Sequence, residues 1–482
     1  MSESEGLEAV RAGLAGRPAW LVGGAVRDRA LGRSTADLDI VVDGDPAEAA
    51  RSVARASGRA ACFAMSEEFG AWRVVARDSS WQLDVERLRG GSLEADLALR
   101  DFTVNAIAEP IEGGAPLDPL GGLEDLAARR LRMAGPEAFV DDPLRVLRLV
   151  RVAVELDLQP EAQTLRSAAA QAGGLKGVSA ERVFMELRRI VAAPRAPWGI
   201  QTMTELGATA VVLPELEALH GVEQSRFHHR DVYGHTLEVL ERTIALTTGR
   251  ATVPGDLDAF LGDHGEEVRA LLAEPLADQQ TRGDALRWGA LLHDAAKPLT
   301  RDIRPSDGRV TFAGHDVRGA ELARAVLERL RASERLRAHV AALVRHHLRL
   351  GFLVHEPQPL SRRTVFGYLW ACSPVEVDVT LLSVADRLAT RGDRAQESID
   401  AHMRVARELL TDALRFRAEG PPRPLIRGDE LAGELGIPLG PRVGELLHEL
   451  AEAQYAGEVN TREQSLRYGR SLLARGDGPP AG

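Results

Sequence analysis

Two aspartates, Asp37 and Asp39, stand at alternate positions of the apolar segment DLDIVV. On a β-strand, residues i and i+2 project from the same face, so the two carboxylates are expected to lie side by side. Carboxylates this close repel each other unless a cation lies between them. Hard divalent cations such as Mg²⁺ take oxygen ligands and leave room for substrate phosphates, so the pattern predicts a magnesium site on a strand.

A third carboxylate and a glycine pair accompany this site. Asp84 lies in WQLDVERLR, an apolar-flanked segment that is expected to be a strand beside the first. A two-metal site that holds an attacking hydroxyl and a leaving phosphate needs such a further carboxylate. Gly23 and Gly24 end one expected strand and open a helix, where backbone N–H groups can receive a phosphate. An isolated DxD is more often a turn or a helix cap, but the ordered combination favours a catalytic site.

Histidines and aspartates form a second pattern farther along the chain. The expected metal ligands, in chain order, are His235, His293, Asp294, His315, His346 (which His347 follows) and Asp386. A lone histidine in an apolar helical frame is more often a core residue, whereas an ordered cluster favours a metal site. Imidazole and carboxylate ligands suit Mn, Ni, Co, Fe or Mg rather than a tetrahedral thiolate zinc site.

Four motifs occur in an order that resembles one enzyme family. They are GGAVRD, the DLD strand, RDFTVNAIA (100–108) and DDPLRVLRLVRVA (141–153). This order resembles that of the class II tRNA nucleotidyltransferases, which comprise the CCA-adding enzymes and the bacterial poly(A) polymerases of the DNA polymerase beta superfamily. The resemblance is close from Leu21 to about Leu213 and looser from there to the C-terminus. The histidine pattern resembles the HD-domain phosphohydrolases, and an HD domain is attached to some of these enzymes.

The resemblance implies a role for each matching position. Asp37 and Asp39 would hold Mg²⁺, and Asp84 would complete the catalytic site near the primer 3′-hydroxyl. The triphosphate and ribose of the nucleotide would be bound by Gly23, Gly24, Arg27, Asp28, Arg100, Asp101 and Asn105. Asp142 and Arg145, which an i, i+3 helical spacing would put on one face, would read the base edge of CTP or ATP, with Arg148 supporting them.

The implied reaction is the template-independent addition of CMP and AMP, from CTP and ATP, to the 3′ end of tRNA by two-metal nucleotidyl transfer. The chain departs from the family at position 99, where Leu99 replaces the usual arginine. Only ten residues separate Arg89 from Arg100, whereas CCA-adding members usually carry a longer flexible loop there. This short segment resembles enzymes that add only the two cytidines.

Three alternatives stay open at this point. A poly(A) polymerase shares nearly the same catalytic motifs. An HD phosphohydrolase could supply the main activity beside a degenerate N-terminal sensor, and the chain could also be a noncatalytic RNA-binding protein. The intact Asp37, Asp39 and Asp84 argue against the last two, because neither needs paired carboxylates on a strand.

The elements that must position these residues follow from the periodicity of the apolar residues. Roughly the first 140 residues alternate strand-like and helix-like segments, which predicts an α/β head with a mixed sheet. Beyond Pro143 the strand patterns nearly vanish, which predicts helical regions. The expected division is a nucleotidyltransferase head (1–140), a helical neck and body that binds the base and the RNA (141–222), an HD domain (223–419) and a C-terminal helical tail (420–482).

Composition narrows the class of protein further. The chain has 482 residues and two cysteines, Cys62 and Cys372, which favours several domains and a reducing, cytoplasmic environment. No apolar run is long enough to span a membrane, and the first residues lack the layout of a secretory signal. A net charge of −11 argues against nonspecific coating of nucleic acid. Basic residues do gather between Arg145 and Arg195, as expected for gripping the acceptor arm of tRNA by its backbone.

Overall fold

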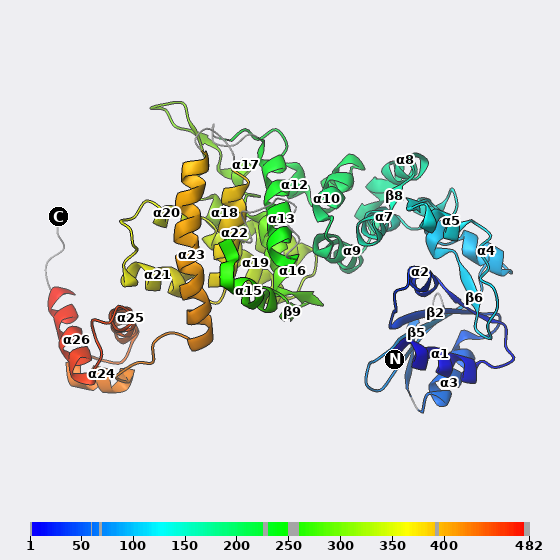
Figure 1. Cartoon of the computed structure of the whole chain (residues 1–482), viewed down its shortest axis with the longest axis horizontal. Helices are drawn as coiled ribbons and strands as arrows, with labels where there is room; N and C mark the ends of the chain where they lie inside the picture. The colour runs from blue at the N-terminus through cyan, green and yellow to red at the C-terminus, as the bar shows by residue number, and fades with distance from the viewer. Residues whose placement is uncertain are drawn as a thin grey trace. The chain divides into compact units, whose positions relative to one another are not determined.

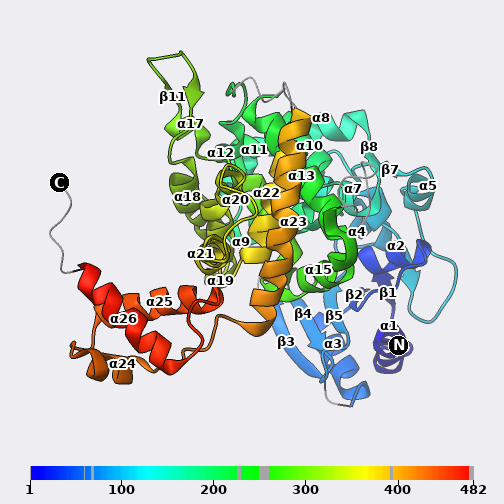
Figure 2. The same ribbon diagram turned by 60° about the vertical axis from the view of Figure 1, so that its left-hand side comes forward.

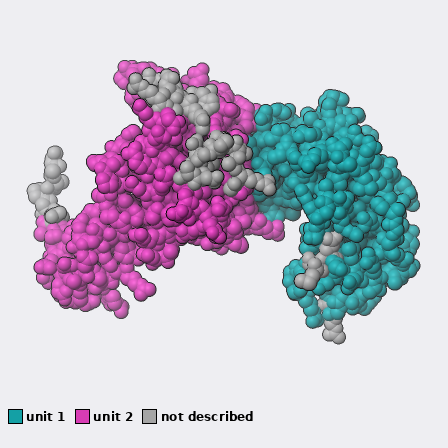
Figure 3. All heavy atoms as spheres, viewed as in Figure 1, with its two compact units in different colours: residues 1–213 teal, residues 214–482 magenta. Residues whose placement is uncertain are grey.

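The computed structural model describes residues 2–58, 60–66, 70–224, 230–248, 260–390 and 395–476. The chain folds into two compact units, residues 1–213 and residues 214–482 (Figure 3). Each unit is described by itself. The finer division into head, body, HD domain and tail stays a prediction.

The first unit begins with a six-stranded mixed sheet in the order β3-β4-β5-β2-β1-β6 (Figure 1). The strands are β1 (Ala19–Val22), β2 (Asp37–Val42), β3 (Ala61–Ser66), β4 (Ala71–Val75), β5 (Gln82–Arg87) and β6 (Ala108–Pro110). Strands β2 and β5 are parallel, and the other neighbours are antiparallel. The predicted α/β head is therefore confirmed.

The two faces of the sheet differ because its side chains alternate. Leu38 and Ile40 of β2 are buried in a core that helices α1 (Ser2–Gly13) and α3 (Pro46–Ala56) cover. Asp37 and Asp39 of the same strand are exposed on the opposite face. The amphipathic pattern of β2 thus fixes which face carries the carboxylates.

The rest of the first unit is helical, as predicted from Pro143 onward. Between the strands lie α2 (Gly24–Ala30), α4 (Leu93–Ala98) and the 3₁₀ turn η1 (Thr103–Asn105). After β6 come α5 (Gly122–Ala127), β7 (Arg130–Leu131) and α6 (Ala138–Asp141). They are followed by α7 (Arg145–Leu156), β8 (Gln159–Pro160), α8 (Ala162–Gln171), the 3₁₀ turn η2 (Ala172–Gly177), α9 (Ala180–Ala192), α10 (Ala196–Glu205) and α11 (Thr209–Val212). Helix α7 packs on α9 and α10 with an apolar face that includes Leu147 and Val150, both fully buried.

The second unit is almost entirely helical. Its centre is formed by α13 (Val232–Thr248), α16 (Arg282–Leu292), α18 (His315–Arg329), α19 (Glu334–His346), α22 (Glu376–Leu388) and the long α23 (Ala395–Glu419). Both ribbon views show α23 running beside α22, and the two helices are in contact (Figure 2). The smaller elements are α12 (Pro214–Glu217), η3 (Gly262–His264), α15 (Gly265–Leu272), α17 (Lys297–Thr300), α20 (Arg349–Leu353), α21 (Arg362–Cys372) and the two-stranded ribbons β9 (Pro275–Ala277) with β10 (Gln280–Thr281) and β11 (Asp302–Ile303) with β12 (Val310–Thr311).

Three helices follow α23 and share a small core of their own. They are α24 (Gly428–Leu435), α25 (Pro441–Tyr455) and α26 (Arg462–Gly476). Leu431, Leu446 and Leu450 are buried among them. Within the described part of the chain no single helix has the length and apolarity to cross a membrane, and only the bent pair α21 and α22 passes that test, when taken together.

Candidate active site

The three predicted carboxylates lie on one face of the sheet in the first unit. The parallel register of β2 and β5 pairs Asp39 with Asp84 and Asp37 with Gln82. Residues paired across neighbouring strands project to the same side, so Asp84 lies beside Asp39, as expected. All three face a cavity of about 460 Å³. The donor set consists of carboxylate oxygens, which is the chemistry that Mg²⁺ prefers.

The carboxyl group of Asp39 is harder to ionise than that of an ordinary aspartate. Desolvation within the cavity raises the pKa of Asp39 to about 6, against the opposing charge of Arg100, and the Asp84 carboxylate adds to the rise. A carboxyl group held this far above its ordinary pKa is stabilised when a metal ion binds its charged form. The residues present therefore fit a hard divalent ion.

The glycine turn approaches this carboxylate closely. Gly23 ends β1 and precedes α2, with a φ of 73° that favours glycine. A Cβ atom at this position would lie 3.1 Å from Oδ2 of Asp39 and 3.3 Å from Nη1 of Arg100. Only glycine gives this turn room beside both groups, and the backbone of Gly23 and Gly24 lines the cavity.

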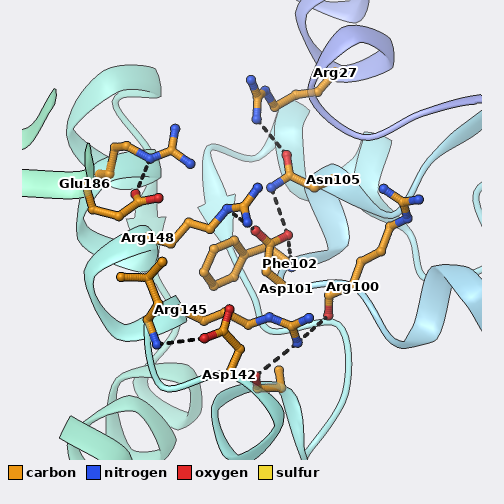
Figure 4. A network of polar contacts seen from close by, with 12 residues as sticks. Arg27, Arg100, Asp101, Phe102, Asn105, Asp142, Arg145, Arg148 and Glu186 are labelled. Atoms are coloured by element: carbon orange, nitrogen blue, oxygen red, sulfur yellow. Dashed lines mark hydrogen bonds and ion pairs between the residues drawn. The ribbon is translucent and has the colours of Figure 1, made fainter. Parts of the chain in front are cut away.

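A hydrogen-bonded network forms another wall of the cavity (Figure 4). Arg27 donates from Nη1 to Oδ1 of Asn105 at 2.6 Å, and Asn105 donates from Nδ2 to Oδ1 of Asp101 at 2.9 Å. Arg148 pairs with the other oxygen of Asp101 at 2.8 Å. Burial opposes ionisation of Asp101, yet Arg148 and Asn105 hold its pKa below the ordinary value. The network keeps guanidinium groups fixed at the cavity wall, where they can receive anionic oxygens.

Asp28 and Arg100 also line the cavity. Asp28 accepts a hydrogen bond from Nε of its neighbour Arg27 at 2.9 Å. Arg100 donates to Oδ2 of Asp96 from Nε at 3.3 Å and from Nη2 at 3.1 Å. Asp96 is 0 % exposed and also accepts from Arg89, at the other end of the short segment. Ser92 caps α4 inside that segment, so most of the ten residues form a helix.

The expected pairing of Asp142 with Arg145 on one helical face is wrong. Asp142 has extended backbone angles (φ −148°, ψ 101°) because it precedes Pro143, and α7 begins only at Arg145. Asp142 pairs with Arg182 of α9 at 2.7 Å. Arg145 instead donates to the carbonyl oxygens of Leu99 and Ala138, each at 3.0 Å. Arg145 lines the cavity.

The second pattern also forms a cluster, inside the second unit. Two sets of groups have ligand atoms within 4.8 Å of one another, His235 with His293 and Asp294, and Asp294 with His315 and His347. Asp294 belongs to both sets. Oδ1 of the sixth predicted ligand, Asp386, lies 2.9 Å from Nε2 of His235, within hydrogen-bond distance.

The orientation of the imidazole rings favours metal binding. The Nδ1 atoms of His293, His315 and His347 lie 2.6–2.8 Å from backbone carbonyl oxygens, which only accept, so each Nδ1 carries the proton. A neutral ring then directs the lone pair of Nε2 into the cluster. Nε2 of His293 lies 3.1 Å from a carboxylate oxygen of Asp294. Because two lone pairs at this distance repel each other, the contact requires either a cation between the atoms or a second proton on the ring. Burial opposes that second proton, but Asp294 raises the pKa of His293.

His347, not His346, is the histidine that faces this cluster. His347 is buried, whereas His346 is only half-buried, and its Nδ1 accepts from Arg349 at 3.1 Å. Desolvation and the nearby arginines Arg349 and Arg345 lower the pKa of His346 to about 4. Successive residues of a helix point in different directions, so only one member of the pair can contact Asp294. The prediction of His346 as a ligand is therefore corrected to His347.

Family models match the parts of the chain that hold the two clusters. Residues 19–132 match the family described as Poly A polymerase head domain, 157–219 match the probable RNA and SrmB-binding site of polymerase A, and 232–391 match the HD domain. An A-adding tRNA nucleotidyltransferase of Deinococcus radiodurans is 38% identical over 450 residues, which are 92% of this chain and 93% of that protein. The chain belongs to the tRNA nucleotidyltransferase family.

Other members of this enzyme family and their structures extend the comparison. A CC-adding tRNA nucleotidyltransferase of Thermus thermophilus is 34% identical over 454 residues, 93% of this chain and 92% of that protein. A solved CCA-adding enzyme with ATP has a TM-score of 0.62 at 19% identity and covers 98% of this chain and 94% of its own. A Thermotoga maritima CCA-adding enzyme complexed with tRNA has a TM-score of 0.60 at 19% identity, over 97% and 94%. At this identity the solved structures establish the shared fold.

Several residues of the carboxylate cavity were missed from sequence. They line the cavity with the predicted residues: Arg73, Glu86, Arg89, Arg151 and Arg189. Glu86 follows Asp84 by two positions, so the alternation of a strand could have placed it on the same face. Arg73 lies on β4, and only the register of the antiparallel pair brings it to Asp84. Lys297 was also missed in the second unit, where its Nζ lies 2.7 Å from Asp294.

Proposed function

We propose that this protein adds nucleotides from CTP or ATP to the 3′ end of tRNA without a nucleic-acid template. The observation that carries the proposal is the row of Asp37, Asp39 and Asp84 on one sheet face, in a cavity whose walls carry arginines. Carboxylates that share a face suit two divalent ions, and the arginines suit a triphosphate. The named functions of the relatives support the same reaction.

In the proposed reaction, Asp37 and Asp39 hold Mg²⁺ and Asp84 lies near the 3′-hydroxyl of the RNA. Bound Mg²⁺ would stabilise the negative charge on the attacking hydroxyl and on the phosphates. The hydroxyl gives its proton to Asp84 or to water, and its oxygen forms a bond to the α-phosphorus. The bond between the α-phosphorus and the oxygen that bridges to the β-phosphate breaks, and pyrophosphate is released. Arg27 and Arg100 orient the triphosphate, which lowers the barrier by positioning the reactants.

Base selection is proposed for Asp142 and Arg145. An aspartate acceptor and an arginine donor match the edges of cytosine and adenine and disfavour uracil and guanine. Both side chains already have protein partners, Arg182 and the carbonyl oxygens of Leu99 and Ala138. A bound base must therefore take over at least one of these contacts, which makes selection a competition between the base and the protein.

We further propose that the enzyme adds cytidines only. The segment between Arg89 and Arg100 is short and mostly helical, and buried Asp96 joins both ends. A fixed segment favours a single nucleotide preference over a switch from C to A. Two relatives with more than 90% coverage are named CC-adding, and the Deinococcus relative is named A-adding. A-only addition is therefore the direct rival.

The test is a set of extension reactions on tRNA transcripts that lack the 3′ CCA or end in CC. With CTP alone, the account predicts two added cytidines on the first transcript. With ATP alone, it predicts no addition to the second. Addition of one A to the CC transcript would establish the rival, a complete CCA end would contradict cytidine-only addition, and long A tails on unstructured RNA would indicate a poly(A) polymerase.

A second candidate activity is metal-dependent phosphohydrolysis in the second unit. The observation that favours it is the sharing of Asp294 by two groups of buried ligands. Transition metals such as Mn, Ni, Co or Fe suit these imidazole and carboxylate donors. Cleavage of bis(p-nitrophenyl) phosphate by wild type, and its loss in His293→Ala, would support this activity. Absence of cleavage with every metal would leave the cluster a structural one.

A further inference from the structure

The carboxylate face of the sheet continues beyond Asp84 to the edge strand β3. Asp39 pairs with Asp84 between β2 and β5, Asp84 pairs with Arg73 between β5 and β4, and Arg73 pairs with Phe63 between β4 and β3. Residues that pair directly across strands point to the same face. One row of side chains therefore runs from the carboxylates to the edge of the sheet.

Arg73 is the third member of this row, after Asp39 and Asp84. Its Nε and Nη2 donate to the two oxygens of Asp84, each at 2.7 Å, in the two-point geometry of an arginine–carboxylate pair. Nη1 has no partner among the described residues, and about a quarter of the side chain (27 %) is exposed. Arg73 thus fixes the orientation of Asp84 and keeps N–H groups available beside it.

Phe63 ends the row at β3 and is 48 % exposed. The neighbouring Met65 is 49 % exposed, while Val74 and Val85 on the other face of the same strands are fully buried. Phe63 is therefore not part of the core, and it stands exposed across the strand pair from Arg73, which lines the cavity. Strands are spaced by about 4.8 Å, so β3 lies about 10 Å from the strand of Asp84, a distance that a dinucleotide spans.

We infer that this edge of the sheet is the subsite for the 3′-terminal nucleotides of the acceptor RNA, with Phe63 stacking on a base and Arg73 binding the adjacent phosphodiester. The inference rests on the proposed transfer to an RNA 3′ end. Every base has a flat face, so stacking on an aromatic ring tolerates any base. An enzyme that lengthens an RNA 3′ end needs a contact that tolerates any base, because the terminal base changes after each addition.

Arg73 acts in this subsite as a positioning residue for Asp84. Nε and Nη2 of Arg73 hold the Asp84 carboxylate in one orientation, while its remaining N–H groups donate to the phosphate. The 3′-hydroxyl of the RNA is thereby placed beside Asp84. Lysine could supply the positive charge but not the two-point contact. The two tasks of Arg73 are therefore separable by substitution.

The test varies tRNA at saturating CTP, and CTP at saturating tRNA, in separate initial-rate series. Phe63→Leu should raise KM for tRNA about tenfold, the cost of losing one stacked base, with KM for CTP unchanged. Phe63→Tyr keeps the ring and should resemble wild type. Arg73→Lys should keep KM for tRNA near that of wild type but lower kcat, and Arg73→Leu should impair both.

Two results would overturn the inference. One is an unchanged KM for tRNA in Phe63→Leu, and the other is an equal rise in KM for CTP. Thermal unfolding of each variant checks that the fold is intact, and Phe63→Tyr and Arg73→Lys keep the test decisive if a larger change unfolds the protein. Failure of wild type to incorporate either CMP or AMP would instead refute the proposed function.

Discussion

The carboxylate cavity of the first unit and the histidine cluster of the second both gather ligands that suit metal ions, but they differ in their access to solvent. Asp37 and Asp39 are exposed on a sheet face. The candidate ligands of the cluster are each at most 8 % exposed: His235, His293, Asp294, His315 and His347. The first site is surrounded by arginines that have cavity-facing surface. In the second, Lys297 is buried against Asp294.

This difference indicates what each site can bind. An open row of carboxylates with cationic walls can exchange large, highly charged reactants such as a nucleoside triphosphate and an RNA end. A buried set of imidazoles and carboxylates can hold a metal tightly and admits only a small part of a substrate. The following predictions test this contrast, from the largest effect to the smallest.

Metal removal should affect the two sites at different rates. A short treatment with EDTA should reduce CMP incorporation to background, because the exposed carboxylates release their ions quickly, and added Mg²⁺ should restore it. Transition metal in the buried cluster should remain after the same treatment. Incorporation assays and elemental analysis of the same samples measure both. Incorporation that survives complete chelation would contradict an open two-metal site.

The basic side chains of the two sites, Arg100 and Lys297, should also differ in their contribution to CTP binding. Arg100→Gln should raise KM for CTP about tenfold or more, since it removes a charge-assisted contact to phosphate. Lys297→Gln is the matched control in the buried cluster and should leave KM for CTP unchanged. Steady-state kinetics with CTP varied would measure both. A normal KM in Arg100→Gln would remove this residue from the triphosphate site.

Base selection should depend on Asp142. Asp142→Ala should reduce the discrimination of CTP against UTP by about tenfold, the value of one well-placed contact to a base edge. The ratio of kcat/KM for the two nucleotides measures it. Arg182→Gln removes only the present partner of Asp142 and should change this ratio less. Equal effects of both substitutions would indicate that the pair is structural.

The smallest predicted effect is on stability. The pKa of Asp39 is raised to about 6 from an ordinary value of 3.8, so the folded protein favours the neutral carboxyl. The stability that this preference contributes is present below the ordinary pKa and is lost as the pH rises through about 6. In metal-free protein, Asp39→Asn should therefore raise the Tm of the first unit at pH 8 and leave it nearly unchanged at pH 4. A lower Tm at pH 8 would contradict the shift.

The sequence predicted the parts of the sites that depend on strand alternation. DLDIVV and WQLDVERL specified both the strands and the face of their carboxylates, and the adjacency of Asp84 followed. The sequence could not distinguish His346 from His347, because both lie in the same apolar helical segment. Only the packing of the helix decides which of the two side chains points into the cluster. Arg73 and Phe63 were missed because antiparallel register is a property of the folded sheet. The extended backbone of Asp142 could have been predicted from the sequence, because this residue precedes Pro143.

The most direct test of the account disables each site in turn by mutation and measures both variants in one assay. Incorporation of labelled CMP into tRNA lacking its 3′ end is measured for wild type, Asp37→Asn/Asp39→Asn and His293→Ala/Asp294→Ala. The account predicts background incorporation for the first variant with tRNA binding retained, and incorporation within about twofold of wild type for the second, since independent sites act separately. Normal incorporation by Asp37→Asn/Asp39→Asn, or its loss only in the histidine variant, would contradict the assignment of nucleotidyl transfer to the carboxylate face.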